Sequence, residues 1–137
     1  MNDTDIQAMI KRHEGYGPNL YMDTAGVLTG GYGHAFHLGS SLPQQVWCQI
    51  FYHDYQQAVR DYEVLDLDID PVRRAVILDM LFNLGLPKML KFKNTLGAIR
   101  AGDWEAAARG MENSKWYGQT RLRAVELVRM MRTGEMP

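Results

Sequence analysis

The segment at residues 13–34, HEGYGPNLYMDTAGVLTGGYGH, constrains the fold more than any other stretch of this chain. Glu14 falls where a first helix must stop, because a glycine follows it at once and a Gly-Pro pair comes soon after. Residues 23–26 have Asp at the first position and Gly at the fourth, which is the signature of a type I turn. Short apolar runs flank this turn, so the segment predicts a helix end and then a β-hairpin that folds Asp23 and Thr29 back towards Glu14.

The helix before this segment is predicted over residues 4–13, where isoleucine and methionine recur at helical spacing and Asp3 or Thr4 can cap the start. Glu14 then lies at the C-terminal end of the helix. A carboxylate there faces the negative end of the helix dipole, which is an unfavourable position for stability. This cost is a first indication that Glu14 has a functional role.

Two carboxylates and a hydroxyl placed together in this way suit the hydrolysis of a glycosidic bond. A protonated carboxyl gives its proton to the leaving oxygen, while an ionised one activates or supports the nucleophile. A threonine hydroxyl can hold a water molecule because it both donates and accepts. Taken singly, each residue has a simpler interpretation, with Asp23 as a turn former, Thr29 as a strand residue and Glu14 as a solvated charge. Their combination with the hairpin favours the catalytic interpretation.

No metal site is expected. His13-Glu14 begins like the helical motif of zinc peptidases, but Gly17 stands where that motif needs its second His. His34 and His37 lack neighbours in the sequence that would complete a set of metal ligands.

Glu14, Asp23, Thr29 and the pair Gly33-His34 resemble, in residue type and spacing, the active-site signature of the phage-type (T4-type) lysozymes, glycoside hydrolase family 24. The resemblance covers nearly the whole chain. It implies that Glu14 is the general acid, Asp23 the carboxylate that activates water, and Thr29 its hydroxyl partner. It also implies a set of substrate-binding residues, namely Tyr32, Gly33, Phe82, Asn83 and Thr95.

The same resemblance implies supporting residues. His34 is expected to pair with Asp54 on the next helix, and Arg123 falls where the family places an Arg that pairs with the catalytic Glu. The chain departs from the family pattern at Ala35, at Gly110 and at residues 121–122, where bulkier, amide-bearing or Pro-containing sequence is usual. These departures affect the assignment of saccharide contacts and leave the chemistry intact.

The rest of the chain predicts a mainly helical α+β protein. Residues 41–44 form a capping box that opens a long helix over about 42–63, and Asp70-Pro71 opens an apolar helix over 71–84. The resemblance implies a lysozyme-like, two-lobed fold around a cleft, in a single domain over residues 1–137. A small hairpin lobe of about residues 13–60 is joined by the long helix to a helical lobe of about 64–137, which also includes the N-terminal helix.

Composition indicates a globular protein, with 46% hydrophobic and 23% charged residues. The single Cys48 excludes an internal disulfide and fits a reducing compartment. Neither a signal peptide nor a membrane-spanning segment is expected, because no basic stretch followed by an apolar run is present at the start.

The charge is distributed unevenly along the chain. Residues 1–70 carry 3 Lys and Arg against 10 Asp and Glu, whereas residues 71–137 carry 12 Lys and Arg against 6 Asp and Glu. The basic half suggests an anionic polymer as partner, either nucleic acid or the cell wall, or else a solvated surface with no partner.

Among these possible partners, the resemblance favours the cell wall. It implies a muramidase that hydrolyses the β-1,4 bond between N-acetylmuramic acid and N-acetylglucosamine in peptidoglycan, with inversion. It implies no cofactor or metal, no nucleic acid and a monomer that accumulates in the host cytoplasm until a holin-type partner permeabilises the membrane. Two alternatives remain open, a lytic transglycosylase and a non-catalytic peptidoglycan-binding module. Asp23 and Thr29 argue against the first, and the intact set with Glu14 argues against the second.

Overall fold

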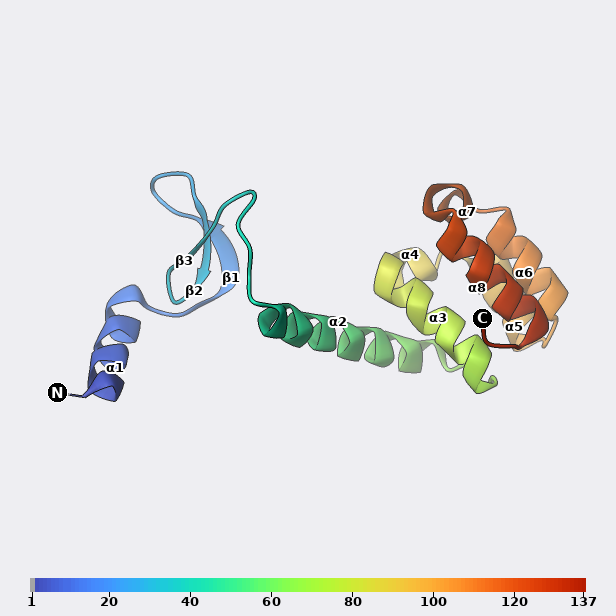
Figure 1. The fold of residues 1–137 in the computed structure, drawn as a ribbon. Coiled ribbons are helices and arrows are strands. Elements are labelled where there is room, and N and C mark those ends of the chain that lie inside the picture. The colour runs from blue at the N-terminus through green and yellow to red at the C-terminus, as the bar shows by residue number, and fades with distance from the viewer. Residues whose placement is uncertain (1) are drawn as a thin grey trace. The chain divides into compact units, whose positions relative to one another are not determined.

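The computed structural model describes residues 2–137, which form a mainly helical α+β protein with a small antiparallel sheet (Figure 1). The elements follow one another along the chain as α1 (Asp3–Glu14), β1 (Gly17–Met22), β2 (Leu28–Gly31), β3 (His34–Phe36), α2 (Gln44–Leu65), α3 (Pro71–Leu84), α4 (Leu86–Met89), α5 (Lys93–Arg100), α6 (Trp104–Glu112), α7 (Lys115–Thr120) and α8 (Leu122–Thr133). No helix among the described residues is both long enough and apolar enough to cross a membrane. The predicted fold class, α+β and mainly helical, is confirmed.

The chain divides into two compact units, one up to Gln44 and one from Gln45 to the C-terminus. The first unit contains α1 and the sheet, and the second contains almost all of α2 and the helices that follow it. The predicted lobes, of about residues 13–60 and about 64–137 with the N-terminal helix, stay a prediction. Each unit is described by itself below.

Helix α1 begins and ends for local reasons. The Asn2 side chain accepts a hydrogen bond from the Asp5 backbone N–H at 2.9 Å, and the Asp5 carboxylate accepts one from the Asn2 N–H at 3.3 Å. This reciprocal capping box makes Asn2 the N-cap residue, whereas the sequence suggested Asp3 or Thr4. The helix ends at Glu14 because Gly15, with φ of 74°, turns the chain out of the helical path. The predicted helix end at Glu14 is confirmed.

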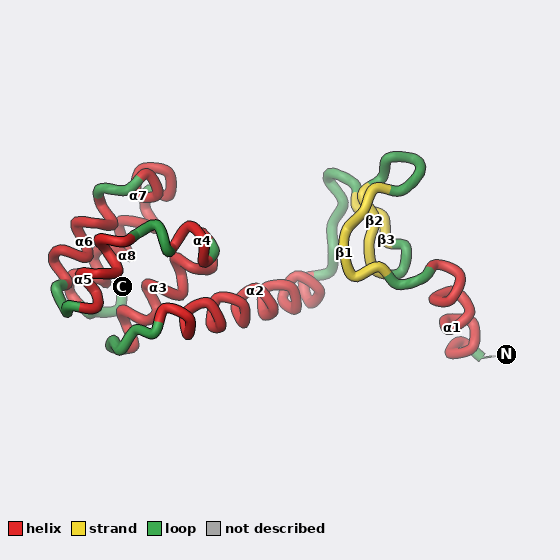
Figure 2. The backbone as a smooth tube through the Cα atoms, turned by 180° about the vertical axis from the view of Figure 1, so that it is seen from behind, coloured by secondary structure: helices red, strands yellow, loops and turns green. Residues whose placement is uncertain are grey.

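The sheet has the strand order β1-β2-β3, with both pairs antiparallel (Figure 2). The predicted hairpin is the β1–β2 pair, in which Tyr21 lies opposite Thr29. The third strand was not predicted. It is only three residues long and pairs through a tight turn at Tyr32-Gly33, so its run is too short to give an alternating apolar pattern. This third strand makes β2 the central strand and puts Ala35 beside Thr29 on its other edge.

The second unit is built around α3. Its bounds, Pro71–Leu84, are those that the sequence predicts, and the Asp70 carboxylate caps it by accepting from the Arg73 N–H at 3.1 Å. Helix α2 begins at Gln44 and ends at Leu65, two residues later at each end than predicted. Helix α8 packs against α3 and α6. The apolar side chains that this packing buries come mostly from α3, α6 and α8, and those with no exposed surface include Val76, Ile77, Met80, Ala107, Met111, Ala124 and Met131.

Arg73 ties α3 to the end of α8. It is buried, and its Nε donates to the Met131 carbonyl at 2.7 Å while Nη2 reaches the Arg132 carbonyl at 3.3 Å. The guanidinium also pairs with Asp70 at 3.0 Å and lies 4.1 Å from the centre of the Trp104 ring. These contacts satisfy carbonyls that the end of α8 leaves without helical partners.

Candidate active site

The C-terminal end of α1 brings the Glu14 carboxyl group against Gly33, in the turn between β2 and β3. A Cβ atom on Gly33 would lie 3.0 Å from Cδ of Glu14 and would overlap its Oε2. Gly33 also has φ of 71°, a conformation that side chains disfavour. Both facts restrict this position to glycine. The Glu14 side chain is exposed and makes no hydrogen bond or ion pair to the residues of the first unit that the structure describes, so its carboxyl group can meet a ligand.

Asp23 is held by the turn that it starts. Its Oδ1 accepts hydrogen bonds from the N–H groups of Ala25 and Val27, both at 2.8 Å. The backbone of the turn closes with the Gly26 N–H on the Asp23 carbonyl at 3.0 Å. The predicted turn is confirmed. The turn uses only Oδ1, and the second carboxylate oxygen has no partner among residues 2–44, so it remains available for chemistry.

Thr29 lies on the central strand β2 and is only 5% exposed. Its hydroxyl donates to the Val27 carbonyl at 2.9 Å. The hydroxyl proton is therefore engaged, and the oxygen is left to accept a hydrogen bond from another donor. The same Val27 carbonyl accepts from the Asp23 N–H at 2.9 Å, so Val27 links the two predicted site residues. The sequence carries no signal for this link, because it runs through backbone atoms.

An aromatic pair stands next to Glu14. The rings of Tyr16 and Tyr32 have centroids 5.1 Å apart, and Lys11 Nζ lies 5.1 Å from the centre of the Tyr32 ring. Both tyrosines are exposed, at 66% and 48%. Tyr32 was predicted as a substrate-binding residue, whereas Tyr16 was missed. Its place directly after Gly15 at the helix end is the sequence signal that could have found it.

The predicted supporting residues lie in both units. His34 is on β3, where its ring meets the Phe36 ring edge-on at 4.7 Å. Asp54 is an exposed residue of α2. Arg123, on α8, donates from Nε to Asp79 Oδ1 at 2.7 Å. The pairing of His34 with Asp54 and that of Arg123 with Glu14 join residues of different units and stay predictions.

The remaining predicted substrate-binding residues belong to the second unit. The Phe82 ring lies 5.3 Å from that of Phe51 on α2, and Phe82 itself is 39% exposed. The Asn83 side-chain oxygen accepts from the indole N–H of Trp116 at 2.9 Å, which fixes both groups. Thr95, near the start of α5, is 2% exposed. Trp116 was not predicted as a site residue, because its contact with Asn83 joins positions far apart in the sequence.

Within residues 2–137, no group of three or more His, Cys, Asp or Glu side chains lies close enough together to hold a metal ion. The predicted site residues of the first unit contribute the Glu14 carboxyl, one oxygen of Asp23 and the Thr29 hydroxyl. These are the groups that acid-base hydrolysis of a glycosidic bond requires.

Several named proteins are similar to this chain, among them the following three. "Probable T4-type lysozyme 1" of Dictyostelium discoideum is 26% identical over 97% of this chain and 96% of its own length. "Pre-baseplate central spike protein Gp5" of Enterobacteria phage T4 is 29% identical over 93% of this chain, which corresponds to 28% of that protein. "Peptidoglycan hydrolase gp36" of Pseudomonas phage phiKMV is 31% identical over 89% of this chain and 14% of its own length. The region similar to this chain therefore spans nearly all of the Dictyostelium relative, but only a part of each of the two phage relatives.

A family comparison covers most of the chain, since residues 11–131 match the family described as phage lysozyme. This range contains Glu14, Asp23 and Thr29 together with every other predicted site residue. The extent of the match and the mainly helical α+β fold agree with each other. The chain belongs to the phage lysozyme family.

Proposed function

We propose that the chain is a muramidase that hydrolyses the β-1,4 bond between N-acetylmuramic acid and N-acetylglucosamine in peptidoglycan. Membership of the phage lysozyme family and the name of the gp36 relative support its coarser part, a glycosidase-type hydrolase of peptidoglycan. The observation that carries the finer part is the arrangement of the first unit. There, a free carboxyl at a helix end accompanies a second carboxylate and a hydroxyl that are linked through one backbone carbonyl.

In this mechanism Glu14 is the general acid, which gives its proton to the glycosidic oxygen as the bond breaks. The free oxygen of Asp23 accepts a proton from the attacking water. The Thr29 oxygen accepts that water's second hydrogen, because its own proton is donated to Val27. A water molecule that donates to both oxygens would point a lone pair at the anomeric carbon. This route inverts the anomeric configuration and requires carboxyl groups about 6.5–9.5 Å apart.

The biological setting is part of the same proposal. The enzyme acts as a monomer, remains in the host cytoplasm, and reaches the wall when a holin-type partner permeabilises the membrane. Peptidoglycan is its polymer partner, and no nucleic acid takes part.

Product analysis on purified peptidoglycan tests the proposal. Hydrolysis should release muropeptides whose muramic acid ends are reducing and carry one added water molecule. Proton NMR of the first products, recorded before the anomers equilibrate, should show the α configuration that inversion requires. Anhydro sugars one water lighter would identify a lytic transglycosylase and refute the proposal. Wall binding without any sugar release would instead show a non-catalytic module.

A further inference from the structure

Two exposed tyrosine rings lie side by side next to the proposed general acid. In the β1–β2 pair, Gly17 lies opposite Gly31, and one further step along each strand brings Tyr16 opposite Tyr32. The centroids of these two rings are 5.1 Å apart, and their planes are tilted by 39°. Residues that lie opposite each other on paired strands have neighbouring side chains. The register of the hairpin therefore holds the two rings together.

The end of α1 supports this pair of rings. Lys11 Nζ lies 5.1 Å from the centre of the Tyr32 ring, which is within the range of a cation–π contact. Lys11 precedes Glu14 by three residues in α1, so the same helix end supplies the acid and this contact. Tyr32 thus lies beside both Lys11 and Tyr16. Tyr16 is the more exposed of the two rings, so it offers the larger surface to a ligand.

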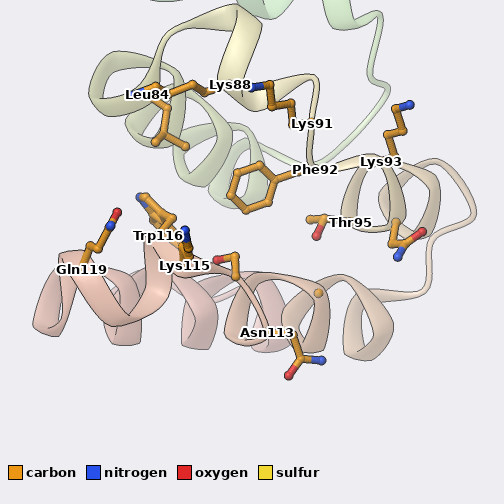
Figure 3. Close-up of a pocket in the computed structure, with 13 residues that line it drawn as sticks. Leu84, Lys88, Lys91, Phe92, Lys93, Thr95, Asn113, Lys115, Trp116 and Gln119 are labelled. Carbon is orange, nitrogen blue, oxygen red and sulfur yellow. The ribbon is translucent and has the colours of Figure 1, made fainter.

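Burial does not account for this pair, in contrast to an aromatic pair of the second unit. There, the rings of Phe92 and Trp116 lie 6.2 Å apart in the lining of a pocket (Figure 3). Trp116 is buried, and its indole N–H donates to Asn83, so packing and a hydrogen bond explain its position. Tyr16 has 66% of its surface exposed. A single exposed ring is ordinary, but neighbouring exposed rings beside a catalytic group indicate a binding surface.

A substrate that reaches Glu14 must come close to these rings. A general acid lies about 2.6–3.2 Å from the oxygen that it protonates, so the two sugars joined by that oxygen stand next to the Glu14 carboxyl. This carboxyl lies against Gly33, which follows Tyr32 in the chain. Tyr16 follows Glu14 after one glycine. A sugar bound at the acid is therefore within reach of the Tyr16 ring.

We propose that Tyr16 binds a sugar ring of the glycan by stacking against it, while Tyr32 and Lys11 support the Tyr16 ring. The proposal rests on the proposed function, which makes a glycan the substrate. An N-acetylhexosamine in a β-1,4 chain presents a face of C–H groups, which are apolar and slightly positive. The face of an aromatic ring is apolar and slightly negative, so the two faces attract each other. The tyrosine hydroxyl can also bond to a hydroxyl or acetamido group of the sugar.

Proton NMR of the full chain with chitotetraose, a soluble β-1,4 tetramer of N-acetylglucosamine, tests the proposal. Sugar protons that lie over an aromatic ring shift upfield because of its ring current. We expect these shifts with the natural chain and their loss in Tyr16→Ala. Tyr52→Ala is the control and should keep them, because Tyr52 is a similarly exposed tyrosine, at 59%, on α2 of the second unit. Upfield shifts that survive in Tyr16→Ala, or their absence with the natural chain, would overturn the proposal.

Variants of Tyr16 separate stacking from simple apolar contact. Tyr16→Phe keeps the aromatic face, whereas Tyr16→Leu keeps an apolar side chain without that face. An aromatic contact contributes a factor of about two to ten in affinity. We expect the Leu and Ala variants to bind chitotetraose more weakly by this factor and the Phe variant to recover most of the affinity. A Leu variant that binds as tightly as the natural chain would refute stacking.

Kinetics on peptidoglycan give a second measurement. Removal of a contact that is equally strong in the bound substrate and in the transition state raises KM and leaves kcat unchanged. Tyr16→Ala should therefore raise KM by about two- to tenfold at nearly constant kcat. A loss in kcat alone would place Tyr16 in the chemical step and contradict the proposed role. Binding of chitotetraose is measured without sugar release, so a failure of the proposed function is distinguishable from a failure of this inference.

Discussion

The two units of this protein keep their residues in place by different means. Among the described residues of the first unit, only Thr29 and Gly30 are buried, and α1 buries none of its side chains. Short-range backbone bonds fix the geometry there, such as the turn bonds around Asp23 and the glycine at the end of α1. The second unit has twenty buried apolar side chains and a buried arginine that joins α3 to α8. The proposed catalytic groups therefore lie in the unit that short-range hydrogen bonds shape, whereas the second unit is shaped by its apolar core.

The difference between the two units predicts which property a substitution in each unit should change. In the first unit, a substitution that keeps the local hydrogen bonds should keep the geometry, whatever it does to the chemistry. In the second unit, a substitution that removes a buried contact should reduce the stability of the whole unit, because its elements share one core. The three predictions below separate these effects.

The largest effect is expected for activity at Asp23. In Asp23→Asn the amide oxygen can still accept from the N–H groups of Ala25 and Val27, so the turn should persist while the base is lost. We expect wall hydrolysis to fall by about 10²- to 10⁴-fold, the usual contribution of acid-base catalysis. Circular dichroism should be unchanged. Asp23→Ala should lose activity to the same extent and also loosen the hairpin, which amide hydrogen exchange at Gly26 and Val27 would detect. Full activity in the Asn variant would refute the role of the carboxylate.

The next effect concerns stability at Arg73. Arg73→Met keeps an apolar chain over Trp104 but leaves the Met131 and Arg132 carbonyls without their donor. We expect the free energy of unfolding to fall by about 2–4 kcal/mol. The control is Arg74→Met, whose guanidinium lies 5.2 Å from the centre of the Tyr62 ring. It should cost about 1 kcal/mol or less. If urea unfolding gave the same loss of unfolding free energy for both variants, the hydrogen bonds from Arg73 to α8 would add no stability of their own.

The smallest effect is a pH dependence at Asp70. Burial raises the pKa of this carboxyl, but the hydrogen bonds from the Arg73 N–H and guanidinium outweigh burial and hold the pKa below its ordinary value of 3.8. A lowered pKa in the folded state gives stability that is present above the ordinary value and is lost as pH falls through the folded one. Asp70→Asn keeps a capping oxygen without the charge. The stability advantage of the natural chain over this variant should therefore shrink as pH drops below about 4, and a constant difference would contradict the assignment.

The same contrast explains how much could be predicted from the sequence. The end of α1 at Glu14, the turn at Asp23 and the cap of α3 at Asp70 all depend on residues within four positions of one another. Sequence patterns report such local rules directly. For this reason the fold class and the backbone around Glu14 and Asp23 were predictable. The family resemblance then supplied the roles that are proposed for these residues.

The features that escaped prediction depend on distant partners or on backbone atoms. The strand β3 is stabilised by pairing with β2 and has no pattern of its own. The carbonyl that links Asp23 to Thr29 belongs to Val27, whose side chain gives no hint of it. Gly110 stood out in the sequence only as a departure from the family pattern. The structure shows that Gly110 leaves space beside the Thr95 hydroxyl where α5 packs against α6, which no local sequence pattern reports.

Replacement of Glu14 by glutamine tests the central claim most directly. Glu14→Gln keeps the shape of the side chain at Gly33 but cannot supply the proton, and Glu126→Gln on α8 is the control with an exposed, unpaired carboxylate of the second unit. The rate of muropeptide release and the thermal unfolding midpoint are measured for both variants and the natural chain. We expect Glu14→Gln to lose about 10²- to 10⁴-fold in rate with an unchanged midpoint, while Glu126→Gln keeps both. A Glu14→Gln variant that retains a tenth or more of the natural rate would contradict the account.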